Sequence, residues 1–479
     1  MGDESSSKRR KVAFSSAADR NAEFCLAKDA IKLHLVSSID DFQDSNLGFC
    51  PTFLEEHFGE SGKIYGYKGL KVDIWLHSSS FHAYADIKYD SIVPVPKSRE
   101  KLEDVLKDVF GDGLVENRDI FSKQLSSFSS QFSDLLSKYA EHIASWQAPA
   151  DSFTRNQVFR LELASSESRV WHQRLNPLVL WFVEGASCIE VDDPRWEVYV
   201  AVETTRDVHK VTGFCNVYRF FHYPDSSRLR ISQVSLERSL THLFNPALLF
   251  QILVLPPYQN KQHGYHLVNA VNDIAMRRNS FDVTMEDPSD KLQLLRDCMD
   301  VMRLLDSTPV LSQVRLAVQR IKEGKTGSEE LLPPSNLACV VRRELKISKV
   351  QFKRCWEVMI LVHLDPGDEK AFTELLSKRL SAELFESKES QQPKLKHVVD
   401  TENKYDSSKT FVMMKFRQRD GGDEAQDGEV DASQREEALK ELVKEKKSHI
   451  LSAVKKVASL CNLRGTPVHF NPRVWIEQS

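Results

Sequence analysis

The stretch from residue 251 to residue 289 restricts the fold of this chain more than any other part of the sequence. It opens with four apolar residues, Ile252 to Leu255, which predict a buried strand, and Pro256 and Pro257 follow. Because proline cannot donate to a strand ladder, pairing is expected to stop or splay at the prolines. A polar loop then leads into a predicted helix, whose apolar residues repeat with helical spacing: Leu267, Val268, Val271, Ile274 and Ala275.

A loop between a strand and the start of a helix has the geometry of an anion site. The first backbone N–H groups of a helix lack partners within the helix, and the helix dipole adds positive potential at that end. Gly264 allows a ligand to approach the backbone closely, so the loop is predicted to accept a pyrophosphate. Units of this kind with one glycine are common, so the loop alone identifies no ligand.

Carboxylates follow at the end of the next predicted strand. The residues from Phe281 to Met285 alternate between apolar and polar, and the strand ends at Glu286-Asp287-Pro288, before a second helix near Ser289. A lysine amine has a pKa of about 10.4 and must lose its proton before it attacks a thioester, so carboxylates beside a phosphate loop suit a general base. The alternative is that Asp287 or Ser289 caps the second helix, and spacing alone favours this alternative for Asp287.

Elsewhere the sequence mixes strand and helix patterns up to about residue 310 and is helical beyond it. Residues 99–146 are predicted to be largely helical, and residues 175–187 to form a buried helix. An antiparallel hairpin is also predicted: Trp196, Val198, Val200 and Val202 alternate with their neighbours, and a polar turn from Thr204 to Asp207 leads to a second strand through Val211, Phe214 and Val217. Three further strands are predicted from alternating apolar residues at 31–35, 72–76 and 159–163.

Composition argues against several classes of protein. The formal net charge is −4, so bulk charge does not indicate nucleic-acid binding, and no direct DNA binding is expected. No apolar run reaches the roughly 20 residues that cross a bilayer, so no membrane association is expected. The eight cysteines are scattered without a C-x-x-C pair, which argues for a reducing compartment and against structural zinc. Cys188, Cys215 and Cys298 are interpreted as small core residues.

Several segments, taken together and in order, resemble the catalytic subunit of type B histone acetyltransferase, within the broader Gcn5-related acetyltransferase fold. The resemblance covers roughly residues 25–310 and suggests a plant member. The matching segments are Phe58-Gly59 with Tyr65 to Lys71, Trp181 to Ser187, Ile189 to Trp196, Ile252 to Gly264, and Glu286-Asp287-Pro288-Ser289 through Leu295-Arg296-Asp297.

This resemblance implies an acyltransferase that uses acetyl-CoA, needs no metal and transfers the acetyl group directly to an amine. Glu286 matches the general base, and Glu184 and Asp287 match further carboxylates that share its work. The backbone of Ile252, Leu253 and Val254 is expected to bind the pantetheine arm and to stabilise the oxyanion. The other residues expected to contact acetyl-CoA are Gln259, Asn260, Lys261, Gln262, His263, Gly264, Tyr265 and Ser289.

The resemblance also implies a substrate and a partner. The family acetylates free, newly made core histone, chiefly the tail of the fourth core histone, and works with a WD-repeat histone chaperone in the nucleus and cytoplasm. Acidic pairs at residues 40–41, 55–56 and 192–193 are either contacts for this basic tail or ordinary solvated faces. The residues expected to contact the histone peptide are Glu60, Trp196, Phe220, Phe221 and His222.

Two features depart from the family's pattern, and the first lies in the phosphate loop. The family loop reads Q-x-x-G-x-G, whereas Gln262 occupies the first glycine position. If the backbone there needs a positive φ, a residue other than glycine costs about 1 kcal/mol. A side chain that crowds the phosphates would also weaken acetyl-CoA binding.

The second departure is an insertion of 18 residues, Val234 to Gln251, at a point where Gln233 should run directly into Ile252. Its initial valine and its Leu-Leu-Phe-Gln end match what an intron translated in frame would encode. The rival interpretation is an evolved helical insert, since Leu236, Leu240, Leu243 and Phe244 have helical spacing. The strand from Ile252 is expected to persist while the insertion leaves the sheet as a poorly packed excursion.

The sequence therefore predicts an α/β (α+β) protein with a mixed acetyltransferase sheet, an N-terminal α+β domain and a helical C-terminal region.

The main alternative to an enzyme is a catalytically impaired histone-binding protein associated with the chaperone, and an acetyltransferase of small-molecule amines is a third interpretation. The basic cluster at residues 8–11 is either a nuclear import signal or a solvated tail. The predicted domains are a disordered basic tail (1–22), an N-terminal α+β domain (23–150), an acetyl-CoA-binding domain with the insertion (151–310), a helical domain (311–417), an acidic linker (418–433) and a C-terminal helix with its tail (434–479).

Overall fold

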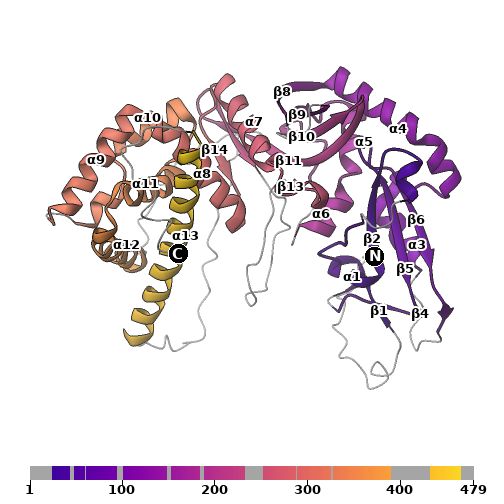
Figure 1. Ribbon diagram of the computed structural model, residues 1–479, viewed down its shortest axis with the longest axis horizontal. Coiled ribbons are helices and arrows are strands. Elements are labelled where there is room, and N and C mark those ends of the chain that lie inside the picture. Colours follow the sequence, from indigo (N-terminus) through magenta and orange to yellow (C-terminus); the bar gives the residue numbers. More distant parts are fainter. Residues whose placement is uncertain are drawn as a thin grey trace, which may run out of the picture. The chain divides into compact units, whose positions relative to one another are not determined.

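The structure is a computed structural model that describes residues 24–43, 48–59, 61–93, 101–147, 153–183, 188–231, 252–286, 288–324, 327–389 and 432–464. These residues pack into two compact units, one drawn from residues 24–296 with 338–349 and the other from residues 297–337 with 350–464. The first unit contains strands and helices, and the second contains helices (Figure 1), which confirms the predicted fold class. The predicted basic tail and most of the predicted linker lie outside the described residues.

A seven-stranded mixed sheet forms the centre of the first unit. Alternating apolar residues build its strands, and side chains such as Val198, Val200 and Val217 are almost completely buried. The helix predicted after the proline pair, α7 (His263–Arg277), packs on this sheet (Figure 1). The strands, in spatial order, are β14 (Val283–Met285), β12 (Ser226–Ile231), β11 (Val208–His222), β10 (Trp196–Thr205), β9 (Thr154–Glu162) and β8 (Ala140–Gln147), with β13 (Ile252–Val254) also paired to β11.

The predicted hairpin is confirmed as β10 and β11, which run antiparallel with Trp196 opposite Tyr218. Its register shifts once, because Ala201 lies opposite Gly213 while Val202 lies opposite Val211. Thr212 is therefore the extra residue of a β-bulge, and bulges of this kind redirect a strand next to a site.

A second, three-stranded sheet lies in the N-terminal part of the same unit, and the strands predicted at residues 31–35 and 72–76 are confirmed there. The helical prediction for residues 99–146 is correct for α3 and α4 but wrong for its last part, which forms β8. The elements of this part are β1 (Phe24–Leu26), α1 (Ala27–Ala30), β2 (Ile31–Val36), η2 (Asp40–Gln43), α2 (Glu55–Phe58), β3 (Lys63–Tyr65), β4 (Tyr67–Lys68), β5 (Lys71–His77), β6 (Ala83–Lys88), β7 (Ser91–Ile92), α3 (Leu102–Phe110), η4 (Gly111–Gly113) and α4 (Arg118–Tyr139).

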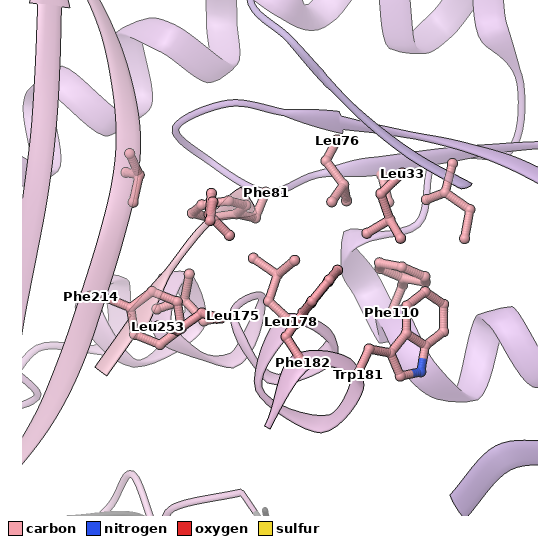
Figure 2. Packing of buried hydrophobic residues seen from close by; sticks show 14 of the residues in the cluster. Leu33, Leu76, Phe81, Phe110, Leu175, Leu178, Trp181, Phe182, Phe214 and Leu253 are labelled. Carbon is pink, nitrogen blue, oxygen red and sulfur yellow. The ribbon is translucent and has the colours of Figure 1, made fainter. Parts of the chain in front are cut away.

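One hydrophobic core joins the two sheets of the first unit. Figure 2 shows Leu178 and Phe182 of α6 (Asn176–Phe182) between side chains of the N-terminal sheet, such as Leu33, and side chains of the central sheet, such as Leu253. Trp181 is completely buried, and its ring lies edge-on to that of Phe110. The buried helix predicted in residues 175–187 is confirmed for its first part as α6, whereas residues 184–187 lie outside the described residues. α6 is preceded by α5 (Ser166–Gln173).

The second unit is a bundle of helices with its own core, in which Phe352, Trp356 and Val454 are buried. The last helix turns one apolar face toward this core, since Val443, Ile450 and Val457 are buried as well. Among the described residues, no helix is long and apolar enough to cross a membrane. The elements from residue 290 onward are α8 (Asp290–Leu305), α9 (Thr308–Lys322), η6 (Ser328–Leu331), α10 (Ser335–Leu345), α11 (Lys349–His363), η7 (Pro366–Asp368), α12 (Glu369–Glu389) and α13 (Ala432–Arg464).

Candidate active site

The central sheet opens where two strands share one edge of β11. Ile231 of β12 lies opposite Val217, and Ile252 of β13 lies opposite Cys215. The far edge of β12 pairs with β14, whereas the far edge of β13 pairs with no strand in the described part of the chain. The sheet therefore parts between β13 and β14, as expected for strands that splay next to the proline pair.

Backbone groups of β13 face this opening. The N–H of Leu255 donates to the carbonyl of Thr212 at 2.9 Å, so Leu255 faces β11. Because backbone groups alternate in direction along a strand, Val254 and Ile252 present their N–H and C=O groups to the open edge. The side-chain amide of Gln259 donates to the Val254 carbonyl at 3.2 Å, which is consistent with this direction. The opening is thus edged with the peptide groups that an extended amide-containing ligand needs.

Glycine at position 213 lets β13 approach β11. A Cβ added to Gly213 would lie 2.6 Å from the Leu253 carbonyl oxygen and 3.0 Å from the Val254 Cα. Both are backbone atoms, which cannot rotate away as the end of a side chain can. The close approach of backbone to backbone therefore depends on the absence of a side chain at this position.

The predicted phosphate loop forms the turn between β13 and α7. A single turn of 3₁₀ helix, η5 (Pro256–Tyr258), begins it. Two of its residues have left-handed backbone conformations, Asn260 with φ 62° and Gln262 with φ 67°. Gln262 immediately precedes α7, and no side chain caps the helix, so the backbone N–H groups of its first turn are available to an anion. The backbone at Gln262 thus has the positive φ that favours glycine, as considered above for this position of the family's loop.

His263 fixes the start of α7 against the sheet. Its Nδ1 lies 3.1 Å from the hydroxyl of Thr212, the bulged residue of β11, and the side chain is buried. Burial and the neighbouring charge of Lys261 lower the pKa of His263 to about 4, so the ring is neutral at pH 7. One bulge in β11 thereby positions both β13, through the Leu255 bond, and the helix start.

Glu286 lies at the mouth of the opening. Its N–H donates to the carbonyl of Ile231 at 3.1 Å, directly after the last β12–β14 pair. Its side chain is 37% exposed, so a substrate amine has access to the carboxylate. The Nη1 of Arg230 lies 3.9 Å from Oε1 of Glu286. Of the carboxylates predicted for catalysis, Glu286 is described, whereas Glu184 and Asp287 lie outside the described residues.

A row of aromatic side chains leads to Glu286, formed by Trp196, Tyr218 and Phe220. The ring centroids are 4.8 Å apart from Trp196 to Tyr218 and 4.6 Å apart from Tyr218 to Phe220. The guanidinium of Arg230 lies 4.5 Å from the centroid of Phe220 and so connects this aromatic row to Glu286. The sequence interpretation missed Tyr218 and Arg230, although Tyr218 is two residues before Phe220 on the same strand and so shares its face.

Other residues predicted to bind the histone peptide lie apart from the aromatic row or outside the described residues. Phe221 is 71% exposed and, as the neighbour of Phe220 on β11, points to the other side of the sheet. His222 stacks on Phe281, with ring centroids 3.6 Å apart, at the other end of β12 from Ile231. Glu60 lies outside the described residues.

Several predicted polar contacts have local partners. Ser289, predicted to contact acetyl-CoA, accepts a hydrogen bond from the N–H of Leu292 and caps α8. Asp193 accepts from Arg195 and from the Tyr218 hydroxyl, and the Arg195 guanidinium lowers the pKa of Asp193 to about 2. Asp41 accepts from the backbone N–H groups of Ser37 and Ser38.

The cysteine interpretation is correct in part. Cys215 and Cys298 are buried, and burial raises the pKa of each thiol. Cys188 is exposed, so its interpretation as a core residue was wrong. Within the described ranges, no group of three or more His, Cys, Asp or Glu side chains is arranged to hold a metal ion.

Replacing Gln262 with glycine is expected to stabilise the loop, because glycine adopts a positive φ without the cost of about 1 kcal/mol that other residues pay. Acetyl-CoA affinity should rise at the same time, since a side chain next to the first turn of α7 is removed. Isothermal titration with acetyl-CoA and thermal unfolding measure the two effects. Unchanged or weaker affinity would mean that the loop already tolerates the glutamine.

Comparisons with known proteins point to one family. The family model described as "Histone acetyl transferase HAT1 N-terminus" matches residues 24–184. The chain is 33% identical to the histone acetyltransferase type B catalytic subunit of Arabidopsis thaliana, over 94% of this chain and 95% of that protein. It is 33% identical to the protein of the same name from Zea mays, over 95% and 94%, and 28% identical to that from Rattus norvegicus, over 74% and 80%.

Proposed function

The chain belongs to the family of histone acetyltransferase type B catalytic subunits, and from this premise we propose that it transfers acetyl groups from acetyl-CoA to lysine amines of free core histone, chiefly the tail of the fourth core histone. One observation carries the proposal. The sheet opens between β13 and β14, a helix start without a side-chain cap lies at one side of the opening, and the accessible carboxylate of Glu286 lies at its mouth.

The opening suits the parts of acetyl-CoA. The free peptide groups of Ile252 and Val254 match the amides of the pantetheine arm, and the first N–H groups of α7 match its pyrophosphate. To bind there, the ligand must displace the Gln259 amide from the Val254 carbonyl or bind beside it. When bound, acetyl-CoA supplies the thioester carbon that an amine attacks.

Glu286 would accept the proton that the lysine ammonium must lose. The amine nitrogen then forms a bond to the thioester carbonyl carbon, and the bond from that carbon to sulfur breaks. The nitrogen loses its second proton as the amide forms, and the departing sulfur takes up a proton, so CoA leaves as the thiol. The Val254 N–H, which faces the opening, is in the best position to stabilise the negative charge on the carbonyl oxygen. Arg230, whose Nη1 lies 3.9 Å from Oε1 of Glu286, would help to hold this carboxylate in place.

The aromatic row is proposed to hold the lysine side chain. Its apolar stem can pack on Tyr218 and Phe220, and its ammonium can interact with their ring faces before deprotonation. Any lysine on a flexible tail could make this contact, which is consistent with a free histone as the substrate.

Specific observations keep the alternative of a catalytically impaired histone-binding protein open. Asn260 and Gln262 both have a positive φ without being glycine. The insertion also enters the chain directly before β13, the strand on which the site depends. If acetyl-CoA does not bind, this alternative is the better one.

Deleting Val234–Gln251 is expected to raise both stability and acetyl-CoA affinity. Between the partners of Ile231 and Ile252, β11 offers a single position, Asn216. After deletion, Ser232 and Gln233 would lie opposite that one residue, which is the count of a β-bulge, so β12 and β13 would join as one strand. Shortening the connection tenfold removes about 2 kcal/mol of closure entropy.

Chemical unfolding and acetyl-CoA titration of the deletion variant test this expectation. The described residues confirm that β13 persists, whereas residues 234–251 themselves lie outside them. A deletion variant that does not fold would identify the insertion as an evolved element and would rule out the retained intron. Sequencing the transcript settles the same point independently.

A nuclear role follows from the proposed substrate, and a cytoplasmic fraction is expected because free histones are made there. A WD-repeat histone chaperone is the proposed partner. The net charge of −4 suits a basic substrate better than DNA, so direct DNA binding is not proposed.

The function is tested with radiolabelled acetyl-CoA on free core histones and, in parallel, on nucleosomes made from the same histones. The expected result is labelling of the free fourth core histone and little labelling of nucleosomes. Labelling of nucleosomes but not of free histone would contradict the proposed substrate. Acetyl-CoA binding without any transfer would support the impaired alternative.

A further inference from the structure

A pocket of about 330 Å³ lies at the end of β12 and β14 that is opposite to Glu286. Ser226 begins β12, and Phe281 comes two residues before β14, whereas Glu286 comes directly after β14. Six residues of β12 separate the two ends by roughly 20 Å. The pocket, named here the basic pocket, is lined by Ser226, Ser280, Phe281, Arg342, Arg343 and Lys346, among others.

The ammonium group of Lys346 is buried in this pocket without a counter-ion. The residue is only 4% exposed, and its Nζ donates to the side-chain carbonyl of Asn279 at 2.6 Å. Among the described residues, no carboxylate forms an ion pair with it, and burial lowers the pKa of Lys346. A buried charge is costly unless an opposite charge or several hydrogen bonds compensate it, and here one neutral acceptor serves three N–H groups.

A buried hydroxyl in the same pocket also lacks a partner. Ser280 is 2% exposed, and its Oγ has no hydrogen-bond partner among the described residues. Its position is fixed, because its backbone N–H donates to the carbonyl of Ala275 at the end of α7. Buried polar groups in folded proteins are nearly always paired, so an orphaned hydroxyl beside an uncompensated ammonium indicates a missing polar partner.

The remaining charges around the pocket leave it positive. The guanidinium of Arg342 lies 4.0 Å from the centroid of Phe281, whose ring also stacks on His222 at 3.6 Å. Arg343 pairs with Glu344, and the nearby acid Asp282 is already paired with Arg228. Lys346 and Arg342 thus carry two positive charges that no described carboxylate neutralises.

We propose that the basic pocket binds a phosphate group, either as inorganic phosphate or as the phosphomonoester of a small metabolite. A tetrahedral dianion matches two uncompensated positive charges and accepts hydrogen bonds from several directions at once, as the ammonium, guanidinium and hydroxyl donors require. A carboxylate carries one charge and two coplanar oxygens. Because Lys346 and Ser280 are buried, a small free ligand reaches them more readily than a phosphate within a polymer backbone. The volume leaves room for a small organic group beside the phosphate.

Isothermal titration of the full chain with inorganic phosphate, sn-glycerol 3-phosphate and acetate, at constant ionic strength, tests the proposal. Lys346→Met and Ser280→Ala remove the two buried donors with little change of volume. Loss of a hydrogen bond to a charged group should weaken phosphate binding about tenfold in each variant. Arg320→Gln, which removes a surface guanidinium elsewhere, is the matched control and should bind as the unmodified protein does.

Thermal unfolding distinguishes a loss of phosphate binding from a loss of folding stability in these variants. Without phosphate, Lys346→Met should be at least as stable as the unmodified protein, because it removes a buried charge without a counter-ion, and Ser280→Ala should be equally stable. Tighter binding of glycerol phosphate than of phosphate would identify a metabolite as the ligand, and the reverse order would identify the free anion. The proposal fails if phosphate does not bind, if acetate binds equally well, or if both variants retain full affinity. The titration needs neither acetyl-CoA nor histone, so its failure leaves the proposed acetyl transfer untouched.

Discussion

Replacing Glu286 with glutamine is expected to lower kcat for histone acetylation about 10²–10⁴-fold, the usual cost of losing a general base. Glutamine keeps the shape of the side chain but cannot accept the proton that the attacking lysine must lose. Acetyl-CoA affinity should change little, because the proposed contacts with that ligand come from β13 and the first turn of α7. Steady-state kinetics on free histone, together with titration of acetyl-CoA, measure the two quantities separately.

Glu103→Gln on α3 is a suitable control, since it removes an exposed carboxylate in a different part of the fold. Its kcat should equal that of the unmodified enzyme. If Glu286→Gln retains full activity across the pH range, Glu286 is not the base, and Glu184 becomes the next residue to test.

Replacing Gly213 with alanine is expected to displace β13 and so to damage both stability and acetyl-CoA binding. The new Cβ would meet the Leu253 carbonyl oxygen at 2.6 Å and the Val254 Cα at 3.0 Å, and neither strand can relieve this by rotating a side chain. Overpacking of this kind costs about 1–3 kcal/mol of folding free energy. The displaced residues are those whose peptide groups line the opening. The free energy of acetyl-CoA binding should therefore weaken by at least a similar amount. Denaturant unfolding and titration measure these effects.

Gly264→Ala provides the comparison. Its added Cβ would meet Val254 and Leu295 side chains at 3.8 and 3.9 Å, which is ordinary van der Waals contact. Alanine is a better helix former than glycine, and Gly264 lies in the first turn of α7, so this variant should be at least as stable as the unmodified protein. Any loss of acetyl-CoA affinity would then reflect crowding of the ligand alone. Equal stability losses at positions 213 and 264 would contradict the account of Gly213.

The sequence predicted those parts of the fold in which local pattern and tertiary environment agree. Alternating valines specified the β10–β11 hairpin, and the proline pair with its polar loop located the end of β13 and the start of α7. The helical prediction for residues 99–146 was wrong at its end, where β8 begins at Ala140. Pairing with β9 on both sides of a register shift at His142 and Ala144 makes this segment a strand, and such tertiary pairing is not visible in a local sequence pattern.

The candidate site was predictable where a single segment carries it and unpredictable where strand register assembles it. The loop and Glu286 lie within one continuous stretch, and the structure brings them to the same opening. The aromatic row depends on which residues of β10, β11 and β12 lie opposite one another. The register between β10 and β11 shifts at Thr212, and a sequence pattern does not reveal such a bulge. The place of Arg230 in the site also depends on strand register, because its pairing with Tyr218 across β11 and β12 puts its guanidinium beside Phe220.

A crystal structure of the full chain with CoA and a lysine-containing peptide from the fourth core histone tests the central claim most directly. The account predicts the pantetheine arm along the open edge of β13, hydrogen-bonded to Val254, with the pyrophosphate at the first N–H groups of α7. The sulfur and the lysine nitrogen should then meet beside Glu286, with the lysine stem on Tyr218 and Phe220. CoA bound elsewhere, or a lysine nitrogen remote from Glu286, would contradict it.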